Sequence, residues 1–233
     1  MKKEDFFNLI HGKMIVSCQA LEGEPLYVEE KSIMYLMAKA AKMAGTPAIR
    51  TNGVRDVIAI KEETDLPVIG LIKKSYPGFE GYITPSIKEV DQLVNAKADV
   101  IAIDCTNQKR GDGLTVEQFV HLVRSKYPNI MIMADISTYE EGMNAIDYGV
   151  DMISTTMSGY TKYSPKTNEP DYDLMYRLSC DSSIPVIGEG RIHTPEQAVK
   201  AFDMGVWSIV VGGAITRPYE IAQRFINAIE KKR

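Results

Sequence analysis

The stretch IPVIGEGRIHTPEQAVKAFDMGVWSIVVGG, residues 184–213, is the part of this chain that says most about its fold. It contains two short apolar runs, Ile184–Ile187 and Trp207–Val211, which are too short for helices and rich in Val and Ile. Runs of that kind are typical of strands that are buried on both faces. Between them, the pattern Thr194-Pro-Glu-Gln197 is a capping box with proline in the first helical position. The stretch therefore predicts a strand, a helix and a second strand parallel to the first.

Six further apolar runs of the same kind precede this stretch at long intervals along the chain. Each is short and apolar, so each also predicts a buried strand. The six runs are Met14–Cys18, Pro47–Ile49, Pro67–Ile72, Val100–Ile103, Ile130–Ala134 and Met152–Ile153.

Helical patterns separate these runs. The first extends from Val28 to Ala44, where apolar residues recur on one face and Gly45 provides a helix stop. A final helix is predicted from about Pro218 to Glu230. Three more helices are predicted to begin with capping boxes, which are formed by Ser86 and Glu89, Thr115 and Gln118, and Thr138 and Glu141.

A short first helix followed by eight strand–helix units predicts a closed (β/α)₈ barrel, or TIM barrel, as one domain over residues 1–233. The alternative, a doubly wound sheet, usually carries a GxGxxG loop after its first strand. Here the first strand is followed by Gln19-Ala-Leu-Glu-Gly-Glu-Pro25. In the later Gly188-Glu-Gly190, His193 stands where the third glycine would be. The sequence therefore favours the barrel.

Composition and charge indicate a globular protein that acts on small molecules. Hydrophobic residues make up 45% of the chain, and the net charge of −4 lacks the basic excess of nucleic-acid-binding proteins. The 3 cysteines form no CxxC pair, so neither a disulfide framework nor a zinc knuckle is predicted. No run approaches the roughly 20 apolar residues of a membrane helix, and the charged N-terminus is unlike a signal peptide. We expect a cytoplasmic protein with no nucleic-acid or membrane partner.

Polar residues follow the predicted strands at the point where each apolar run ends. The carboxyl ends of barrel strands form one mouth, and the active sites of such barrels lie there. Cations, carboxylates and an amide meet at this mouth, which favours a functional site over a merely solvated rim. The residues are Gln19, Arg50, Lys73, Lys74, Asp104, Asp135, Thr155, Thr156, Glu189, Gly212 and Gly213.

Glycines after the last two strands indicate a phosphate site, which barrels of this type place there. Gly190, Gly212 and Gly213 allow backbone N–H groups to approach a ligand closely, and the start of a helix adds the positive end of its dipole. We also assign Arg191 to this phosphate site. Arg217 can add charge there or reach the sugar.

Lys73 and Glu189 follow the third and seventh strands, on opposite sides of the predicted barrel. A lysine in a closed mouth can have a lowered pKa and act as a base, or it can form a Schiff base. A carboxylate partner can act as the second acid or base. Lys74 is better suited to a surface charge. Asp104 and Asp135 can orient the lysine, bind hydroxyl groups of a ligand, or simply accept hydrogen bonds from loop N–H groups.

The histidines do not indicate a metal site. His11, His121 and His193 are scattered, and no two of them lie at one predicted strand end. A cage of histidines and carboxylates is therefore not predicted. We expect no metal and no other cofactor.

Seven strings of the sequence together carry a resemblance to one family, the N-acetylmannosamine-6-phosphate 2-epimerases of bacterial sialic acid catabolism. They occur in order from the first strand to the last, so the resemblance covers nearly the whole chain. The strings are Ser17-Cys-Gln-Ala20, Ala48-Ile-Arg-Thr-Asn-Gly53, Ile69-Gly-Leu-Ile-Lys73, Met133-Ala-Asp-Ile-Ser137, Ser154-Thr-Thr156 with Gly159-Tyr-Thr161, Gly188-Glu-Gly190 and Val210-Val-Gly-Gly-Ala-Ile-Thr-Arg-Pro218.

The resemblance implies a phosphate-binding barrel that interconverts N-acetylmannosamine 6-phosphate and N-acetylglucosamine 6-phosphate without a metal or a nucleotide. It implies a homodimer, and it implies that Lys73 is the acid and base at C2 with Glu189 as its partner. The residues that would hold the sugar are Gln19, Arg50, Asp135 and Arg217, to which we add Thr156 and Tyr160 from the matching strings.

The chemistry of these residues agrees with that reaction but leaves several points open. Inversion at C2 requires removal of a proton next to the open-chain aldehyde and its return to the other face. Arg50 or Gln19 can donate to the enolate oxygen. The sequence does not decide whether Lys73 serves both faces or Glu189 serves one of them. A class I aldolase or lyase with a Schiff base at Lys73, and a non-catalytic sugar-phosphate sensor, remain alternatives.

Overall fold

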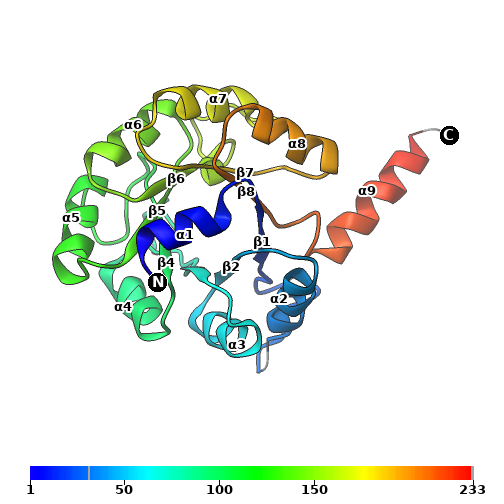
Figure 1. Ribbon diagram of the computed structural model, residues 1–233, viewed down its shortest axis with the longest axis horizontal. Helices are drawn as coiled ribbons and strands as arrows, with labels where there is room; N and C mark the ends of the chain where they lie inside the picture. The colour runs from blue at the N-terminus through cyan, green and yellow to red at the C-terminus, as the bar shows by residue number, and fades with distance from the viewer. Residues whose placement is uncertain (31, 232–233) are drawn as a thin grey trace.

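The eight apolar runs form the strands of a closed barrel in the computed structural model, which describes residues 1–30 and 32–231 (Figure 1). Every strand is parallel to its neighbours, and β8 pairs with β1 to close the barrel. The predicted (β/α)₈ fold is therefore confirmed. The strands are β1 (Met14–Cys18), β2 (Ile49–Asn52), β3 (Val68–Leu71), β4 (Val100–Asp104), β5 (Met131–Asp135), β6 (Met152–Ser154), β7 (Val186–Glu189) and β8 (Ser208–Val211).

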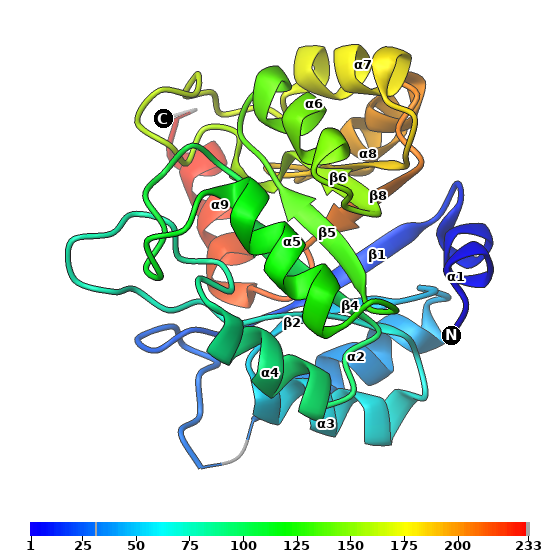
Figure 2. The ribbon, with the colours of Figure 1, turned by 90° about the vertical axis from the view of Figure 1, so that its left-hand side faces the viewer.

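Helices alternate with the strands and cover the outside of the barrel, as α4, α5 and α6 show in Figure 2. The capping boxes predicted at Thr115, Thr138 and Thr194 are present. None of the described helices is long and apolar enough to cross a membrane. The helices are α1 (Lys3–Ile10), α2 (Met34–Met43), α3 (Val54–Thr64), α4 (Ile87–Asn95), α5 (Val116–Lys126), α6 (Tyr139–Asp147), the 3₁₀ helix η1 (Thr155–Met157), α7 (Tyr172–Asp181), α8 (Pro195–Asp203) and α9 (Pro218–Glu230).

The helix predicted from Val28 begins only at Met34, so this boundary is wrong. The carbonyl oxygens of Val28 and the next residue accept hydrogen bonds from the Arg55 guanidinium, at 2.7 Å each, and are not available to helical N–H groups. The Ser32 hydroxyl then accepts from the Met34 N–H at 3.0 Å, just before the helix begins. A long-range contact from α3 thus shortens α2. Lys31, within the predicted range, lies outside the described residues.

The capping box predicted at Ser86 is not formed, although α4 begins where it was expected. The Ser86 hydroxyl donates to the Glu89 carboxylate at 2.5 Å and accepts from the Lys88 N–H at 3.3 Å. Lys74 and Tyr76 also donate to that carboxylate, at 3.1 and 3.0 Å. These side chains between β3 and α4 hold Glu89, so it does not cap the backbone of Ser86.

Several strands extend beyond the apolar runs that predict them. Asp104, Asp135 and Glu189 are the last residues of β4, β5 and β7, and Arg50 lies within β2. They are not the first loop residues that the sequence predicts. In the sheet register, Asp104 pairs with Asp135. Because the ladder holds their backbones, their side-chain directions are fixed by the alternation of the strands.

Helix α1 closes the barrel at the end where the strands begin, and Figure 1 shows it lying across that end. Its Phe6 and Ile10 are fully buried and pack in the same core cluster as Ile15 from inside the barrel. The indole N–H of Trp207 donates to the carbonyl oxygen of Phe7 at 2.9 Å. Figure 2 shows long loops at the opposite end, where the strands stop. The strand-end polar residues therefore lie at the end of the barrel that α1 leaves open.

Helix α9 differs from the other described α-helices because none of its residues is buried. Figure 1 shows it pointing away from the barrel. Its exposed apolar side chains are Tyr219, Phe225, Ile226 and Ile229, with exposed fractions between 53% and 69%. Contiguous apolar surface of this kind commonly marks an interaction site.

Candidate active site

A cavity of about 340 Å³ lies at the end of the barrel where the strands stop. Its volume is within the range of pockets for small ligands. Among the residues assigned to catalysis, to the sugar or to the phosphate, Asp135 alone does not line it. The predicted residues that do are Gln19, Arg50, Lys73, Thr156, Tyr160, Glu189, Gly190, Arg191, Gly212, Gly213 and Arg217.

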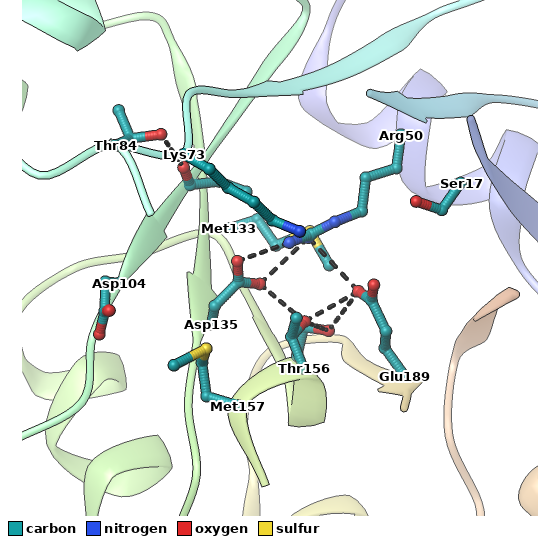
Figure 3. A network of polar contacts seen from close by, with 12 residues as sticks. Ser17, Arg50, Lys73, Thr84, Asp104, Met133, Asp135, Thr156, Met157 and Glu189 are labelled. Atoms are coloured by element: carbon teal, nitrogen blue, oxygen red, sulfur yellow. Dashed lines mark hydrogen bonds and ion pairs between the residues drawn. The ribbon is translucent and has the colours of Figure 1, made fainter. Parts of the chain in front are cut away.

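Arg50 and Asp135 form a buried ion pair beneath the cavity (Figure 3). The two terminal nitrogens of Arg50 donate to the two carboxylate oxygens of Asp135 at 3.0 and 2.6 Å. The side chains are 1% and 0% exposed. This two-point geometry is the strongest form of the arginine–carboxylate interaction. Asp135 therefore holds Arg50 in place, and neither of its oxygens faces the cavity unpaired.

Lys73 follows β3, and two backbone contacts fix where its side chain starts. Its N–H donates to the side-chain oxygen of Asn52 at 2.7 Å, and it forms an antiparallel bridge with Ile83. Figure 3 shows its side chain directed towards the Arg50 guanidinium. Burial lowers the pKa of the amine below its ordinary value, and the charges of Arg50 and Arg217 lower it further. At a given pH, the neutral and basic form of this amine is thus more populated than that of an ordinary lysine.

Glu189 ends β7, on the wall of the barrel opposite β3. Its Oε2 lies 2.8 Å from the Thr156 hydroxyl and 3.3 Å from the Ser154 hydroxyl. Burial raises the pKa of the carboxyl above its ordinary value. The charge of Arg50, 3.4 Å away, opposes that effect, and the charge of Asp135 adds to it. The site thus contains an amine with a lowered pKa and a carboxyl with a raised pKa.

Arg217 is fixed at the mouth by two carboxylates. Its guanidinium lies 3.0 Å from Glu24 in the loop after β1 and 3.0 Å from Glu220 in the first turn of α9. Its side chain is 30% exposed, so it can also meet a ligand. Arg217 therefore joins the two segments that border this side of the cavity.

The predicted phosphate-binding residues form a close wall of the cavity. Gly190 has a φ of +109°, a conformation that favours glycine. A side-chain carbon at Gly213 would lie 2.5 Å from the Glu220 carboxylate. Arg191 donates from Nε and Nη1 to two backbone carbonyl oxygens, and its buried Nη2 has no partner among the described residues. A ligand with several acceptor oxygens can supply that missing partner.

Asp104 and Lys74 lie outside the cavity. The Asp104 carboxylate accepts from the Tyr82 N–H at 3.2 Å and from the N–H and hydroxyl of Thr106 at 3.0 and 2.6 Å. Figure 3 shows it turned away from the other polar groups. The Lys74 amine pairs with a carboxylate of α4 at 3.1 Å. Neither residue orients Lys73, and Asp104 instead fixes the loops around it.

Several lining residues escape prediction because they lie in loops or within strands. No local pattern specifies the path of the loop that brings Glu24 to the cavity, and Ser17 lies inside β1. The sequence singled out His193 only because it stands where the third glycine of a GxGxxG loop would be. The other unpredicted lining residues with polar side chains are Tyr82, Thr216 and Glu220. Within residues 1–30 and 32–231, no three His, Cys, Asp or Glu side chains gather as metal ligands.

A comparison with protein families matches most of this chain. The model of the family described as "Putative N-acetylmannosamine-6-phosphate epimerase" matches residues 34–231. The match covers most of the barrel, from α2 to the end of α9. It agrees with the resemblance carried by the seven strings.

Individual relatives match over nearly their whole length. A protein of Caldanaerobacter subterraneus subsp. tengcongensis named "Putative N-acetylmannosamine-6-phosphate 2-epimerase" is 53% identical, with 98% of this chain and 96% of the relative covered. A protein of Clostridium perfringens with the same name is 49% identical, with 96% and 99% covered. The solved structure of the N-acetylmannosamine-6-phosphate 2-epimerase from Clostridium perfringens superposes with a TM-score of 0.90 at 49% identity, covering 95% of each chain. The resemblance is confirmed.

The first prediction concerns the buried ion pair. Asp135→Asn removes the charge that compensates Arg50, so we expect a loss of about 3–5 kcal/mol in the free energy of unfolding. Asp91→Asn is the matched control, because Asp91 pairs with Lys126 at the surface, and we expect it to cost about 1 kcal/mol or less. Urea unfolding followed by circular dichroism measures both. Equal losses in the two variants would contradict the assigned role of Asp135.

Proposed function

The chain belongs to the N-acetylmannosamine-6-phosphate 2-epimerase family, and from this premise we propose that its cavity interconverts N-acetylmannosamine 6-phosphate and N-acetylglucosamine 6-phosphate. The protein is then an isomerase that inverts the configuration at C2. One observation carries the proposal: a half-buried lysine with a lowered pKa lines the same cavity as a carboxyl on the opposite wall. We place the reaction in the catabolism of sialic acid and amino sugars, in the cytoplasm, where charged sugar phosphates are retained.

Lys73 acts as the base in this proposal. In the open-chain sugar, C2 is next to the C1 aldehyde, so the proton on C2 is acidified by the carbonyl group. The neutral Lys73 amine removes that proton, and the electron pair moves to the aldehyde oxygen to give an enolate. General bases work best when their pKa lies near the working pH. Burial and the charges of Arg50 and Arg217 bring the lysine towards that range.

Arg50 stabilises the negative charge of the enolate. Its guanidinium is held rigidly by Asp135, so it needs no reorganisation when charge develops. Gln19 lies at the same cavity, and its buried Oε1 has no partner among the described residues. We assign that oxygen to a hydroxyl or N–H donor of the open-chain sugar. We propose that this stabilisation by side chains suffices without a metal ion.

The phosphate of the substrate lies at the wall formed by the loops after β7 and β8. Gly190, Gly212 and Gly213 present backbone N–H groups there, and Arg191 and Arg217 supply positive charge. The phosphate thus anchors one end of the sugar while its other end reaches the lysine and the carboxyl. Tyr160 borders the same cavity and contacts the sugar in this arrangement.

The direct test is a proton NMR time course with N-acetylmannosamine 6-phosphate in D₂O with EDTA present. We expect N-acetylglucosamine 6-phosphate that carries deuterium at C2, because the lysine proton exchanges with solvent. Epimerisation that stops when EDTA is added would disprove the metal-free mechanism alone. Absence of product with and without added divalent cations would disprove the epimerase function.

A second prediction separates the two adjacent lysines. Lys73→Ala should lower kcat by about 10³-fold or more, since a general base contributes about 10²–10⁴-fold. The variant also lacks the amine that lies beside Arg50. Lys74→Ala is the matched control and should leave kcat little changed, because its amine pairs with Glu89 outside the cavity. Initial rates of both variants at saturating substrate measure the effect. Similar rates for Lys73→Ala and the wild type would show that Lys73 is not the base.

We also propose that the protein is a homodimer that covers the apolar face of α9. That helix has no buried residue in the isolated chain, and Phe225 and Ile229 are 69% and 60% exposed. Burying such side chains contributes roughly 1.5–3 kcal/mol each, which favours association. A second copy of the chain covers this apolar surface, and the same residues of both copies then form the interface, as in most symmetric dimers.

Light scattering of the purified protein tests the dimer. We expect a mass of twice the chain for the wild type and a shift towards the monomer for the double variant Phe225→Glu and Ile229→Glu, because two carboxylates would be buried in the interface. Leu122→Glu, an exposed apolar position on α5, is the control and should remain dimeric. A monomeric wild type at micromolar concentration would contradict the proposal.

A further inference from the structure

Lys73 lies beyond the last paired residues of β3, so the barrel sheet does not by itself hold it in place. The pairing of β3 with β4 ends at Gly70 and Ile101. The pairing of β3 with β2 ends at Leu71 and Asn52. The lysine follows two residues after Leu71, and other contacts must fix the backbone that carries its side chain.

The direction of the Lys73 side chain follows from the alternation of side chains along β3. Ile69 and Leu71 are fully buried in the core cluster inside the barrel. Ile72 instead packs against the cluster between the strands and the outer helices. In an extended chain, every second side chain points to the same face. Lys73 therefore points inward, towards Arg50 in Figure 3, only while the backbone stays extended through Ile72.

Two side chains supply the backbone contacts that the sheet lacks here. The Thr84 hydroxyl accepts from the Ile72 N–H at 3.2 Å and donates to the Ala102 carbonyl oxygen of β4 at 2.7 Å. It thus stands between β3 and β4, just beyond their last paired residues. On the side of β2, the Asn52 Oδ1 accepts from the Lys73 N–H at 2.7 Å. Side chains therefore bind the N–H groups of both residues that extend β3.

The backbone of Thr84 has a conformation that is rare for its residue type. Its φ is +46°, in the left-handed region, which a β-branched residue seldom adopts. Its N–H donates to the Ile72 carbonyl oxygen at 2.7 Å, and the carbonyl of Pro85 accepts from the Arg110 guanidinium at 2.9 Å. Strained backbone persists only where its surroundings fix it, and it is frequent at functional sites. The strain indicates that the position of this buried hydroxyl matters beyond stability.

We propose that Thr84 and Asn52 are positioning residues, which hold the chain extended beyond β3 and thereby direct the Lys73 amine into the cavity. Neither Thr84 nor Asn52 lines that cavity, so each acts through the lysine and not by contact with a ligand. The placement of the amine follows from the hydrogen bonds of the chain. Its catalytic consequence rests on the proposed epimerase function.

Loss of the Thr84 hydroxyl would leave two backbone groups without a partner. Ala102 is fully buried, so its carbonyl oxygen is shielded from water, and an unpaired buried acceptor is unfavourable. Either the Ile72 N–H moves over to that carbonyl, or both groups stay unpaired and the segment loosens. The backbone of Lys73 shifts in both cases. A misplacement of about 1 Å at a reacting group can lower turnover about 10²-fold.

Competitive acetylation tests the placement of the amine without any need for activity. Trace acetic anhydride labels each amine according to its neutral fraction, and mass spectrometry over a pH series gives the pKa of each lysine. In the wild type, burial and the charges of Arg50 and Arg217 lower the pKa of Lys73. Thr84→Val removes the hydroxyl and Asn52→Leu removes the acceptor, so both should move the amine out of that environment and raise its pKa. Thr84→Ser should keep the wild-type value.

Thr64→Val is the matched control, because Thr64 forms the same pair of bonds at the end of α3, before β3 begins. Its hydroxyl donates to the Ile60 carbonyl oxygen at 2.7 Å and accepts from the Leu66 N–H at 3.3 Å, and the residue is fully buried. Thr64→Val should destabilise the barrel as Thr84→Val does but leave the pKa of Lys73 unchanged. A wild-type pKa of Lys73 in folded Thr84→Val or in folded Asn52→Leu would overturn the proposal.

Steady-state kinetics test the catalytic consequence. Thr84→Val and Asn52→Leu should lower kcat by about 10- to 100-fold, because the base is misplaced. KM should change little, since the proposed phosphate wall lies after β7 and β8. Thr84→Ser should restore most of kcat, and Thr64→Val should keep it. An equal fall of kcat in Thr64→Val, or a rise of KM as the main effect in Thr84→Val, would indicate a merely structural role and overturn the proposal.

The two tests separate the failure of this inference from the failure of the proposed function. If no epimerisation is detected but the pKa of Lys73 rises in both variants, the positioning role stands and the epimerase function fails. If the wild type epimerises its substrate and that pKa does not change, the epimerase function stands and the inference fails. Melting temperatures show which variants are folded. Asn52→Leu acts from the opposite side of the segment, so it decides the question if Thr84→Val does not fold.

Discussion

The ion pair of Arg50 and Asp135 is the interaction on which the rest of the site depends. Both side chains are almost fully buried, so each would destabilise the barrel if its partner were absent. Two-point contact fixes the guanidinium at the bottom of the cavity, where its charge acts on Lys73 and Glu189. Because β2 and β5 supply the two partners, the closed barrel itself sets the electrostatics of the site.

Local sequence patterns predicted the strands and most helix starts well, because these depend on nearby residues. Apolar runs located all eight strands, and the capping boxes at Thr115, Thr138 and Thr194 form as expected. The errors arise from distant contacts. Arg55 binds the carbonyl oxygens ahead of α2, and side chains after β3 bind Glu89 of α4. No local pattern contains that information.

The same difference between local patterns and distant contacts applies to the candidate site. Residues at strand ends could be predicted to meet, since parallel strands of a barrel all end at one mouth. The role of each side chain at that mouth could not be predicted. Asp135 was assigned to the sugar from the family resemblance and Thr156 from the matching strings, and the hydrogen bonds that both side chains form within the chain could not be predicted. Glu24 reaches the cavity from a loop, and only the fold reveals it.

The distribution of charge explains how one small cavity can lower the pKa of an amine and, in the proposed function, still bind a phosphate. Each cation near Lys73 has its own carboxylate, since Asp135 binds Arg50 and Glu24 binds Arg217. Burial is accordingly the largest cause of the lowered pKa of the lysine. In the proposed function, the phosphate adds negative charge at the glycine wall, across the cavity from the lysine strand. Because the two regions lie on different strands, this charge raises the pKa of Lys73 less than an adjacent carboxylate would.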